Sequence, residues 1–260
     1  MLKVVKIGGN IIDNPDALHS FLIDFAAMPG PKVLIHGGGK EASRLCRDMG
    51  IEPKLIDGRR VTDRPTLDVV AMVYAGLINK RIVAGLQALG CNAVGLSGAD
   101  GNVIPATRRS PEPVDYGFVG DINPECIDAA FVLSLTGENK VPVFCAICHD
   151  GYGSLLNCNA DSVAAAVALA LSRIEEVELL FCFEKRGVLS DIDDDSSVIP
   201  VVTAADFDRM KRQGIVAKGM IPKLQNALNC AAGGVAKVRI CDAESILTPT
   251  SGTEICVEHE

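Results

Sequence analysis

The sequence predicts an α/β fold, a three-layer αβα sandwich around a mostly parallel central sheet. Short β-branched runs alternate with stretches of helical length along the chain, and such alternation is typical of a parallel sheet with helices on both faces. Several of the helical stretches begin with recognisable capping residues. At 260 residues, of which 48% are hydrophobic, the chain is long enough for one large domain or two closely packed lobes.

Six apolar runs that are rich in β-branched residues are predicted to be the main strands. They occupy residues 4–7, 33–36, 93–96, 142–147, 177–183 and 237–241. Each run has the length of a strand and is separated from the next by helical or loop-like sequence. We therefore expect parallel strands that are joined by crossover helices.

Three helix starts can be recognised from their capping residues. Asn14-Pro15 opens the first helix and Asp63-Arg64-Pro65 opens a long one that runs towards Leu89, because Asn or Asp caps a helix and proline suits its first turn. Thr203 is followed three residues later by Asp206, which is the spacing of a capping box. We therefore expect another helix to begin there.

Two stretches interrupt the alternation and are rich in Gly, Pro, Asp and Ser. They are residues 97–120 and 187–200, and this composition predicts hairpins or flaps over a site. The second contains the acidic run 191–195, which we interpret as a solvated loop because its spacing does not match a calcium-binding loop. A soft boundary is expected near residues 171–176, where an alanine-rich helix gives way to a new strand.

The overall composition argues against several classes of partner. A net charge of −8 and a pI near 5.1 do not suit a protein that binds nucleic acid through a broad basic surface. The N-terminus enters a predicted strand at once, and no apolar run reaches the roughly 20 residues of a membrane span. We therefore expect a cytoplasmic protein without a membrane partner. The ten cysteines are expected to be free thiols, since most lie in apolar runs.

Two glycine clusters, Gly8-Gly9 and Gly37-Gly38-Gly39, each follow a predicted strand. Glycine at the carboxyl end of a parallel strand lets backbone N–H groups approach an anion, and a following helix adds its positive end. Both clusters are candidate phosphate-binding loops, although tight turns without a ligand have the same pattern. Neither matches a Walker A loop or a complete dinucleotide-binding fingerprint. His36, which precedes the second cluster, is interpreted as a hydrogen-bonding residue rather than a catalyst.

Six short motifs occur in an order and at spacings that are typical of one family. They are K-x-G-G from Lys6, H-G-G-G from His36, R-V-T from Arg60, G-L-S-G-x-D-G from Gly95, N-x-N-A-D from Asn157 and G-M-I-x-K from Gly219. Through this ordered set, from residue 3 to beyond residue 223, the chain resembles the amino acid kinase superfamily and, within it, the acetylglutamate kinases. Each motif is short, but the ordered set is specific.

The resemblance implies the amino acid kinase fold and a particular reaction. Residues 1–172 would form an N-terminal lobe for the acylated amino acid and for dimerisation, and residues 173–260 a C-terminal lobe for ATP. The implied enzyme is an acetylglutamate kinase of arginine biosynthesis, which uses ATP and Mg²⁺ to phosphorylate the side-chain carboxylate of N-acetyl-L-glutamate. A carboxyl group with a pKa of about 4.3 is ionised at neutral pH. The reaction therefore needs positioning and charge neutralisation rather than a general base.

The resemblance also implies which residues handle the phosphoryl group. Lys6 and Lys223 would reach it from opposite lobes as compact point charges, and Asp161 would orient both lysines. Gly8 and Gly9 would donate N–H groups to phosphate oxygens. The alternatives are that Asp161 is only a first-turn carboxylate of its helix and that Lys223 is a solvated surface residue.

On the acceptor side, the resemblance implies that Gly38 and Gly39 hold the substrate near its reacting carboxylate. Arg60 and Asn157 would bind the other carboxylate and the acylamino group, and a forked guanidinium suits bidentate binding of a carboxylate. A surface ion pair is the alternative interpretation of Arg60. No protein ligands for a metal are expected, because phosphate oxygens and water would hold the Mg²⁺.

Two segments depart from the pattern of the family. The strand end Cys182-Phe183-Glu184-Lys185-Arg186-Gly187 has glutamate where the relatives have aspartate, so Glu184 and Gly187 are predicted ATP-binding residues whose detailed contacts are open. The run Cys145-Ala146-Ile147-Cys148 stands where the relatives have small residues, near the wall expected to face the acyl group. An acyl group larger than acetyl, such as succinyl, is therefore an alternative.

Other functions stay open at this point. Within the superfamily the alternatives are glutamate 5-kinase, carbamate kinase, aspartokinase and uridylate kinase, and outside catalysis a silent sensor of an amino acid or nucleotide. The segment from Cys145 to His149 fits the c-type haem pattern C-x-x-C-H, but no export signal accompanies it, and a zinc site lacks a second cysteine pair. From the resemblance we expect a homodimer that is insensitive to arginine, because the first strand begins by residue 2.

Overall fold

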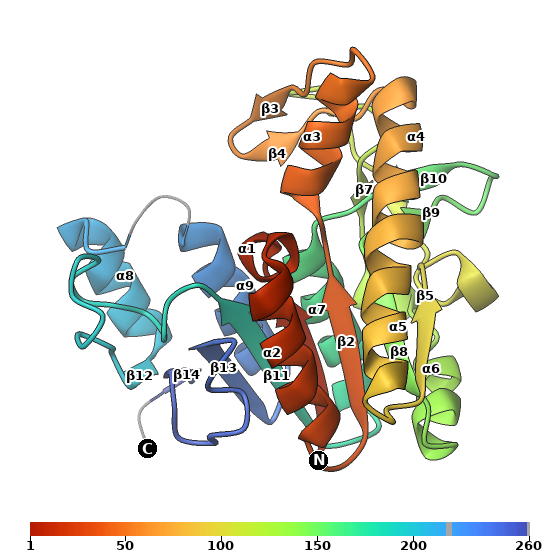
Figure 1. Cartoon of the computed structure of the whole chain (residues 1–260). Coiled ribbons are helices and arrows are strands. Elements are labelled where there is room, and N and C mark those ends of the chain that lie inside the picture. Colours follow the sequence, from red (N-terminus) through yellow and green to blue (C-terminus); the bar gives the residue numbers. More distant parts are fainter. Residues whose placement is uncertain (217–219, 259–260) are drawn as a thin grey trace.

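The computed structural model describes residues 1–216 and 220–258 and contains one eight-stranded sheet (Figure 1). Its strand order is β12-β14-β13-β11-β1-β2-β8-β5. All neighbouring strands are parallel except β13 and β14, which are antiparallel. The strands are β1 (Leu2–Ile7), β2 (Lys32–His36), β5 (Ala93–Leu96), β8 (Val141–Cys145), β11 (Val177–Phe183), β12 (Val201–Val202), β13 (Lys237–Asp242) and β14 (Thr253–Ile255).

Helices cover both faces of this sheet, so the predicted αβα sandwich is confirmed. Helices α2 and α5 pack on one face, and α6, α7 and α9 pack on the other (Figure 1). The helices are α1 (Gly9–Asp13), α2 (Pro15–Ala27), α3 (Gly39–Asp48), α4 (Arg64–Ala71), a π-helix (Met72–Ile78), α5 (Asn79–Ala88), α6 (Ala129–Gly137), α7 (Ala160–Ser172), α8 (Ala204–Gln213) and α9 (Ile221–Ala232), with 3₁₀ turns at Asp100–Asn102 and Pro124–Cys126.

The predicted helix starts are confirmed by their hydrogen bonds. The Asn14 side chain accepts from the backbone of α2, and the Asp63 side chain accepts from Thr66 N at the start of α4. Thr203 and Asp206 form a reciprocal capping box at the start of α8. Local sequence was sufficient here, because a cap is satisfied by residues within one turn of it.

The six predicted strands are present, with two differences in detail. The strand predicted over residues 142–147 ends at Cys145, and Ile147 begins a separate hairpin, β9 (Ile147–His149) with β10 (Leu155–Asn157). The short edge strands β12 and β14 were not predicted. Each has only two or three residues, too few to show a periodic pattern.

Helices α4 and α5 are joined by the π-helix into one continuous helix, residues 64–88. It is long and apolar enough to cross a membrane, but Val70, Val73, Ile82 and Leu86 are fully buried in the core of the sandwich. π-Helical turns widen a helix locally and are frequent at functional sites. Here the widened turn carries Tyr74, which lies against the second glycine cluster.

The carboxyl ends of the parallel strands meet at one edge of the sheet. Lys6 lies near the end of β1, His36 at the end of β2 and Phe183 at the end of β11. Small hairpins extend beyond this edge (Figure 1): β3 (Leu55–Ile56) with β4 (Arg59–Arg60), β6 (Thr107–Arg108) with β7 (Gly120–Asp121), and β9 with β10. Ligands of open parallel sheets bind at such an edge.

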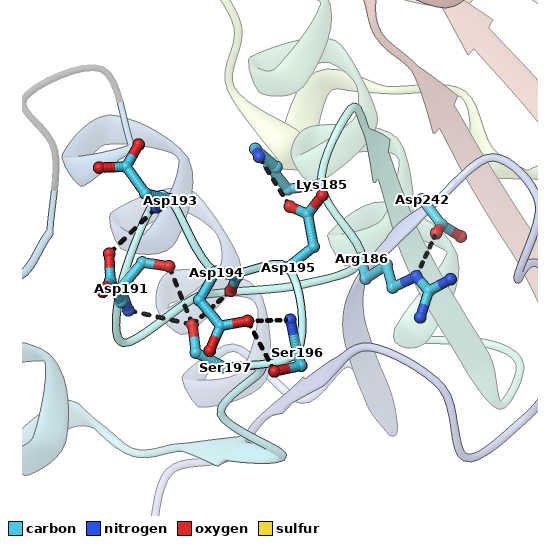
Figure 2. A network of polar contacts seen from close by, with 9 residues as sticks. All are labelled: Lys185, Arg186, Asp191, Asp193, Asp194, Asp195, Ser196, Ser197 and Asp242. Atoms are coloured by element: carbon cyan, nitrogen blue, oxygen red, sulfur yellow. Dashed lines mark hydrogen bonds and ion pairs between the residues drawn. The ribbon is translucent and has the colours of Figure 1, made fainter.

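The acidic run forms an exposed loop, as predicted, and this loop is bonded mainly to itself. Figure 2 shows Asp193 N donating to Asp191 and Ser196 N donating to Asp194, while Lys185 pairs with Asp195 at 2.7 Å. An antiparallel bridge between Leu189 and Val198 closes the loop as a hairpin. These carboxylates cap the turns of their own loop, a common role of aspartate.

Candidate active site

A cleft of about 460 Å³ lies at the carboxyl edge of the sheet, a size that suits small-molecule ligands. Ten of the eleven predicted site residues line it. They are Lys6, Gly8, Gly9, Gly38, Gly39, Arg60, Asn157, Asp161, Glu184 and Lys223. The structure therefore brings together residues from the two halves of the chain that are more than two hundred positions apart.

The charge of the cleft opposes the charge of the whole protein. Its lining contains six basic residues (Lys6, Lys40, Arg59, Arg60, Arg109 and Lys223) but only two acidic ones (Asp161 and Glu184), whereas the chain carries −8. A local excess of cations in a concave site attracts anionic ligands. The cleft thus suits a ligand with several negative charges.

Lys6 and Asp161 form a nearly buried ion pair at the base of the cleft. Lys6 Nζ lies 2.7 Å from Asp161 Oδ1, and the two side chains are 8% and 13% exposed. Asp161 occupies the first turn of α7 behind the Asn159 cap, but it also faces Lys6. Asp161 Oδ1 has no hydrogen-bond partner of good geometry among the described atoms, so this oxygen contacts the ammonium group through charge rather than through an aligned hydrogen bond.

Lys223 enters the cleft from the first turn of α9 and is half-buried. Burial lowers the pKa of its ammonium group, and nearby Lys6 lowers it further, whereas Asp161 and Glu184 raise it. Its Nζ lies 3.7 Å from the centre of the Phe183 ring. Lys223 is therefore not a solvated surface residue. The motif that it ends begins at Gly219, which lies outside the described residues.

The two glycine clusters have different geometries. Gly8 donates its N–H to Cys182 O at 3.1 Å, which joins the end of β1 to β11, and Gly9 lines the cleft beside it. Gly38 has φ +152°, and a Cβ there would lie 2.2 Å from Ile78 Cδ1. A side chain here would strain the backbone and would require Ile78 and Tyr74 of the π-helix to shift, so glycine is favoured at this position. Lys40 links the clusters by donating to Asn10 Oδ1.

Arg60 reaches the cleft from the β3–β4 hairpin. Its Nη2 donates to Gly39 O at 2.8 Å and to Ser43 Oγ at 2.6 Å. Its Nη1 is buried and has no hydrogen-bond partner among the described residues. A buried charged donor without a partner is costly, so this group points to an anionic ligand. The turn Asp57-Gly58 has positive φ at both residues, which is typical of a two-residue hairpin.

Asn157 is held at the end of β10 by contacts to another loop. Its Nδ2 donates to Thr62 Oγ1 at 3.0 Å, and its backbone N donates to Phe118 O. Thr62 follows Arg60 by two residues, so one short segment places both predicted acceptor-binding groups. The Oδ1 atom of Asn157 remains able to accept from an acylamino N–H.

The two segments that depart from the family pattern, residues 182–187 and 145–148, lie only partly in the cleft. Gly187 does not line it, and a Cβ at this glycine would lie 2.7 Å from Thr253 Oγ1, so its visible role is close packing and its assignment to ATP stays a prediction. Cys145 and Cys148 are fully buried, and burial raises the pKa of the Cys145 thiol to about 12. Of that run, Ala146 lines the cleft.

Five polar or aromatic residues are among the lining residues that sequence reasoning missed. They are Lys40, Ser43, Tyr74, Arg109 and Phe183. Lys40 stands next to the glycine cluster, which was an available signal. The other four have no local pattern, because a helix face, a hairpin and a strand end bring them together only in the folded chain.

His36 is a buried hydrogen-bonding residue. Its Nδ1 lies 2.9 Å from Gly37 O and its Nε2 lies 3.0 Å from Asn79 Nδ2. Burial lowers the pKa of the imidazole to about 4. The ring is therefore neutral at pH 7, with Nδ1 donating to Gly37 O and Nε2 accepting from Asn79.

The fold and the cleft together define an α/β protein that binds anionic small molecules beside two glycine loops. The profile of the amino acid kinase family matches residues 1–242, and the chain belongs to that family. It is 50% identical over 254 residues to the acetylglutamate kinase of Phocaeicola vulgatus and 49% identical over 254 residues to that of Bacteroides thetaiotaomicron, with 98% of each chain covered. Among solved structures, smu.665 from Streptococcus mutans UA159 superimposes with a TM-score of 0.79 at 26% identity, over 99% of both chains.

Proposed function

We propose that this enzyme transfers the γ-phosphoryl group of ATP to the side-chain carboxylate of N-acetyl-L-glutamate, the second step of arginine biosynthesis. The observation that carries the proposal is the pairing, in one cleft, of two convergent lysines with an arginine that has an unused donor. Relatives that are about half identical over nearly their whole length are named acetylglutamate kinases. A dianionic acceptor and a polyphosphate donor together require this concentration of positive charge.

The acceptor would lie between the second glycine cluster and the β3–β4 hairpin. Arg60 Nη1 is the free donor for the α-carboxylate, and Asn157 Oδ1 is the acceptor for the acylamino N–H. Gly38 and Gly39 line the same wall. This arrangement leaves the side-chain carboxylate directed towards Lys6.

ATP would enter from the side of β11 and α9, where Glu184 and Lys223 line the cleft. In this proposal the Gly9 amide donates to a phosphate oxygen, whereas the Gly8 N–H, which sequence reasoning assigned the same role, donates to Cys182 O. Among the described residues no cluster of three or more metal-binding side chains occurs. Mg²⁺ would therefore be held mainly by phosphate oxygens and water, with Glu184 as a carboxylate that lines the cleft beside Asp161, and it would neutralise phosphate charge.

The phosphoryl transfer needs no proton transfer. A carboxylate oxygen of the acceptor forms the new bond to the γ-phosphorus while the bond to the β,γ-bridging oxygen breaks, and ADP leaves with that electron pair. Lys6 and Lys223 offset the charge that gathers on the transferred oxygens. Asp161 holds Lys6 at 2.7 Å and attracts Lys223, so both ammonium groups are positioned before substrate arrives.

Acetyl is the acyl group that the cleft favours over succinyl. A succinyl group would add a third carboxylate, and the cleft contains Arg109 as a further cation. However, Arg109 is already paired with Asp121 through its Nε and Nη2 atoms. Its charge is therefore largely neutralised, and a small uncharged acyl group needs no partner beside Ala146.

The test is ATP-dependent formation of an acyl phosphate, trapped with hydroxylamine. N-acetylglutamate, N-succinylglutamate, free glutamate and aspartate are offered in parallel with Mg²⁺, and Lys6→Met serves as the inactive control. We expect product from N-acetylglutamate and none from the free amino acids. Product from N-succinylglutamate alone would overturn the acetyl assignment. If neither acylated substrate gives an acyl phosphate, the proposed reaction is wrong.

We also propose the larger organisation that the resemblance implies. Residues 1–172 would bind the acceptor and make a homodimer contact, residues 173–260 would bind ATP, and the enzyme would act in the cytoplasm. The distribution of lining residues supports the division, because Arg60 and Asn157 belong to the first half and Glu184 and Lys223 to the second.

A further inference from the structure

One aromatic ring contacts two of the lysines that line the cleft, Lys6 and Lys223. Lys223 Nζ lies 3.7 Å from the centre of the Phe183 ring, and Lys6 Nζ lies 4.7 Å from it. Both distances are within the range of cation–π attraction. The lysines come from β1 and α9, so the ring joins groups from opposite ends of the chain.

The ring is held in place from several sides. Phe183 ends β11, is 6% exposed and stacks on Phe181 with 6.1 Å between ring centres and 2° between planes. Gly8 packs beside it, since a Cβ at this glycine would lie 3.8 Å from Phe183 Cδ1. Such a fixed ring presents a constant negative face to a cation.

The ring and the carboxylate hold their lysines in different ways. Asp161 pairs with Lys6 and cancels much of its charge. Among the described residues, Lys223 makes no hydrogen bond or ion pair, and its ammonium group contacts the Phe183 ring. A quadrupole attracts an ammonium group but carries no net charge, so the full positive charge of Lys223 remains available to a phosphate.

We propose that Phe183 is a positioning residue that holds the Lys223 and Lys6 ammonium groups over its ring, so that both meet the transferred phosphoryl group and Lys223 keeps its full charge. This inference rests on the proposed function, because it assigns the lysines to phosphoryl transfer. A packing role alone would require only an apolar side chain of similar size at this strand end. The two roles differ in one property, the electron density of the ring.

Stepwise fluorination of Phe183 isolates that property. The side chain is replaced by 4-fluoro-, 3,5-difluoro- and 3,4,5-trifluorophenylalanine, which weaken the negative face with little change of shape. We expect kcat for acyl-phosphate formation from N-acetylglutamate to fall stepwise, by about tenfold in total, which is about 1.4 kcal/mol. KM for N-acetylglutamate and the melting temperature should stay unchanged. A kcat that is constant along the series would overturn the proposal.

Three further variants test the same proposal. Trifluorophenylalanine at Phe131, which packs beside Gly101 away from the cleft, is the matched control and should leave kcat unchanged. Phe183→Tyr keeps an electron-rich ring and should retain activity, whereas Phe183→Leu should lose as much as the trifluoro variant. Full activity of Phe183→Leu would contradict the positioning role.

A measurement without substrate separates this inference from the proposed reaction. In the ligand-free enzyme with ¹³C-dimethylated lysines, the Lys223 methyl signal should be shifted upfield by the ring, and Phe183→Leu should remove that shift. Lys223→Arg identifies the signal. If the shift is present but no acylglutamate is phosphorylated, the proposed function fails and the contact stands. If the wild type is active and the shift is absent, the positioning role fails.

Discussion

Arg60 combines two satisfied hydrogen bonds with a buried Nη1 that has no partner in the described structure. We expect Arg60→Ala to raise KM for N-acetylglutamate by about 10- to 100-fold, since a charge-assisted hydrogen bond contributes about 1.5–3 kcal/mol. The kcat value should change less, because the reacting carboxylate is at the other end of the acceptor. Steady-state kinetics measure both, with the exposed Arg44→Ala as control. An unchanged KM would contradict the assignment.

The buried ammonium group of Lys223 is expected to lower the free energy of unfolding at neutral pH. Its pKa is lowered from 10.5, mainly by burial. Between the folded-state and unfolded-state pKa values the unfolded chain binds more protons, so the free energy of unfolding rises with pH in that window. At pH values below both pKa values, the full destabilisation that results from burying the charged Lys223 is present.

We therefore expect Lys223→Met to be more stable than the wild type at pH 7, with an advantage that shrinks as the pH approaches 10.5. The same variant should lose at least about 100-fold in kcat, the usual effect of removing a group that stabilises transition-state charge. Thermal melts between pH 7 and pH 10 test the expected stability, and a kinetic assay tests the expected loss of kcat. A variant that is less stable at pH 7 would show that the charge of Lys223 stabilises the fold.

His36 links stability to pH in the acidic range. Its folded-state pKa of about 4 lies below the ordinary 6.5, so the stability that neutral His36 contributes is present above pH 6.5 and is lost as the pH falls towards 4. We expect the wild type to lose about 2–3 kcal/mol more than His36→Gln between pH 7 and pH 4.5. Urea unfolding at both pH values measures this difference. Equal losses would mean that His36 is not buried in its neutral form.

At the scale of elements, the β3–β4 hairpin positions Arg60 in the cleft. Its turn includes Gly58 at φ +75° with open space around it. We expect Gly58→Ala to raise KM for the acceptor by about fivefold, because a non-glycine residue in this conformation costs about 1 kcal/mol. Gly50 has the same φ and equally open surroundings at the end of α3, so Gly50→Ala should cause the same strain without the KM effect. If the two variants have the same KM for the acceptor, the hairpin does not contribute to substrate binding.

The helices differ in how far local sequence determines them. The caps at Asn14, Asp63 and Thr203 follow from residues within one turn. The π-helical turn does not, since it exists where Tyr74 and Ile78 must pass the side-chain-free Gly38. Such a turn depends on a neighbour from elsewhere in the chain.

At the scale of the whole molecule, the long helix 64–88 is apolar but only partly covered. Only 44% of its most apolar 18-residue window is buried, and Met72 is 51% exposed. We expect two copies to cover this face, so sedimentation should give about twice 27.4 kDa, and arginine should change neither the mass nor the rate. Met72→Glu should yield monomers, because a buried unpaired charge is costly. A monomeric or hexameric wild type would contradict the homodimer.

The sequence alone determined the fold class, the main strands, the helix caps and the residues of the six motifs. These features are local, because period, capping and glycine turns are set by neighbouring residues. The acidic loop, a solvated segment in the prediction, is closed by its own aspartate caps.

Only the tertiary structure decided which of these residues meet and in what state. It joined the Gly8 amide to Cys182, left Arg60 Nη1 without a hydrogen-bond partner among the described residues, and placed Gly187 outside the cleft. It also set Phe183 between Lys6 and Lys223. The physical reason is that burial, pKa and pairing depend on groups brought together from distant parts of the chain, and no local pattern records those contacts.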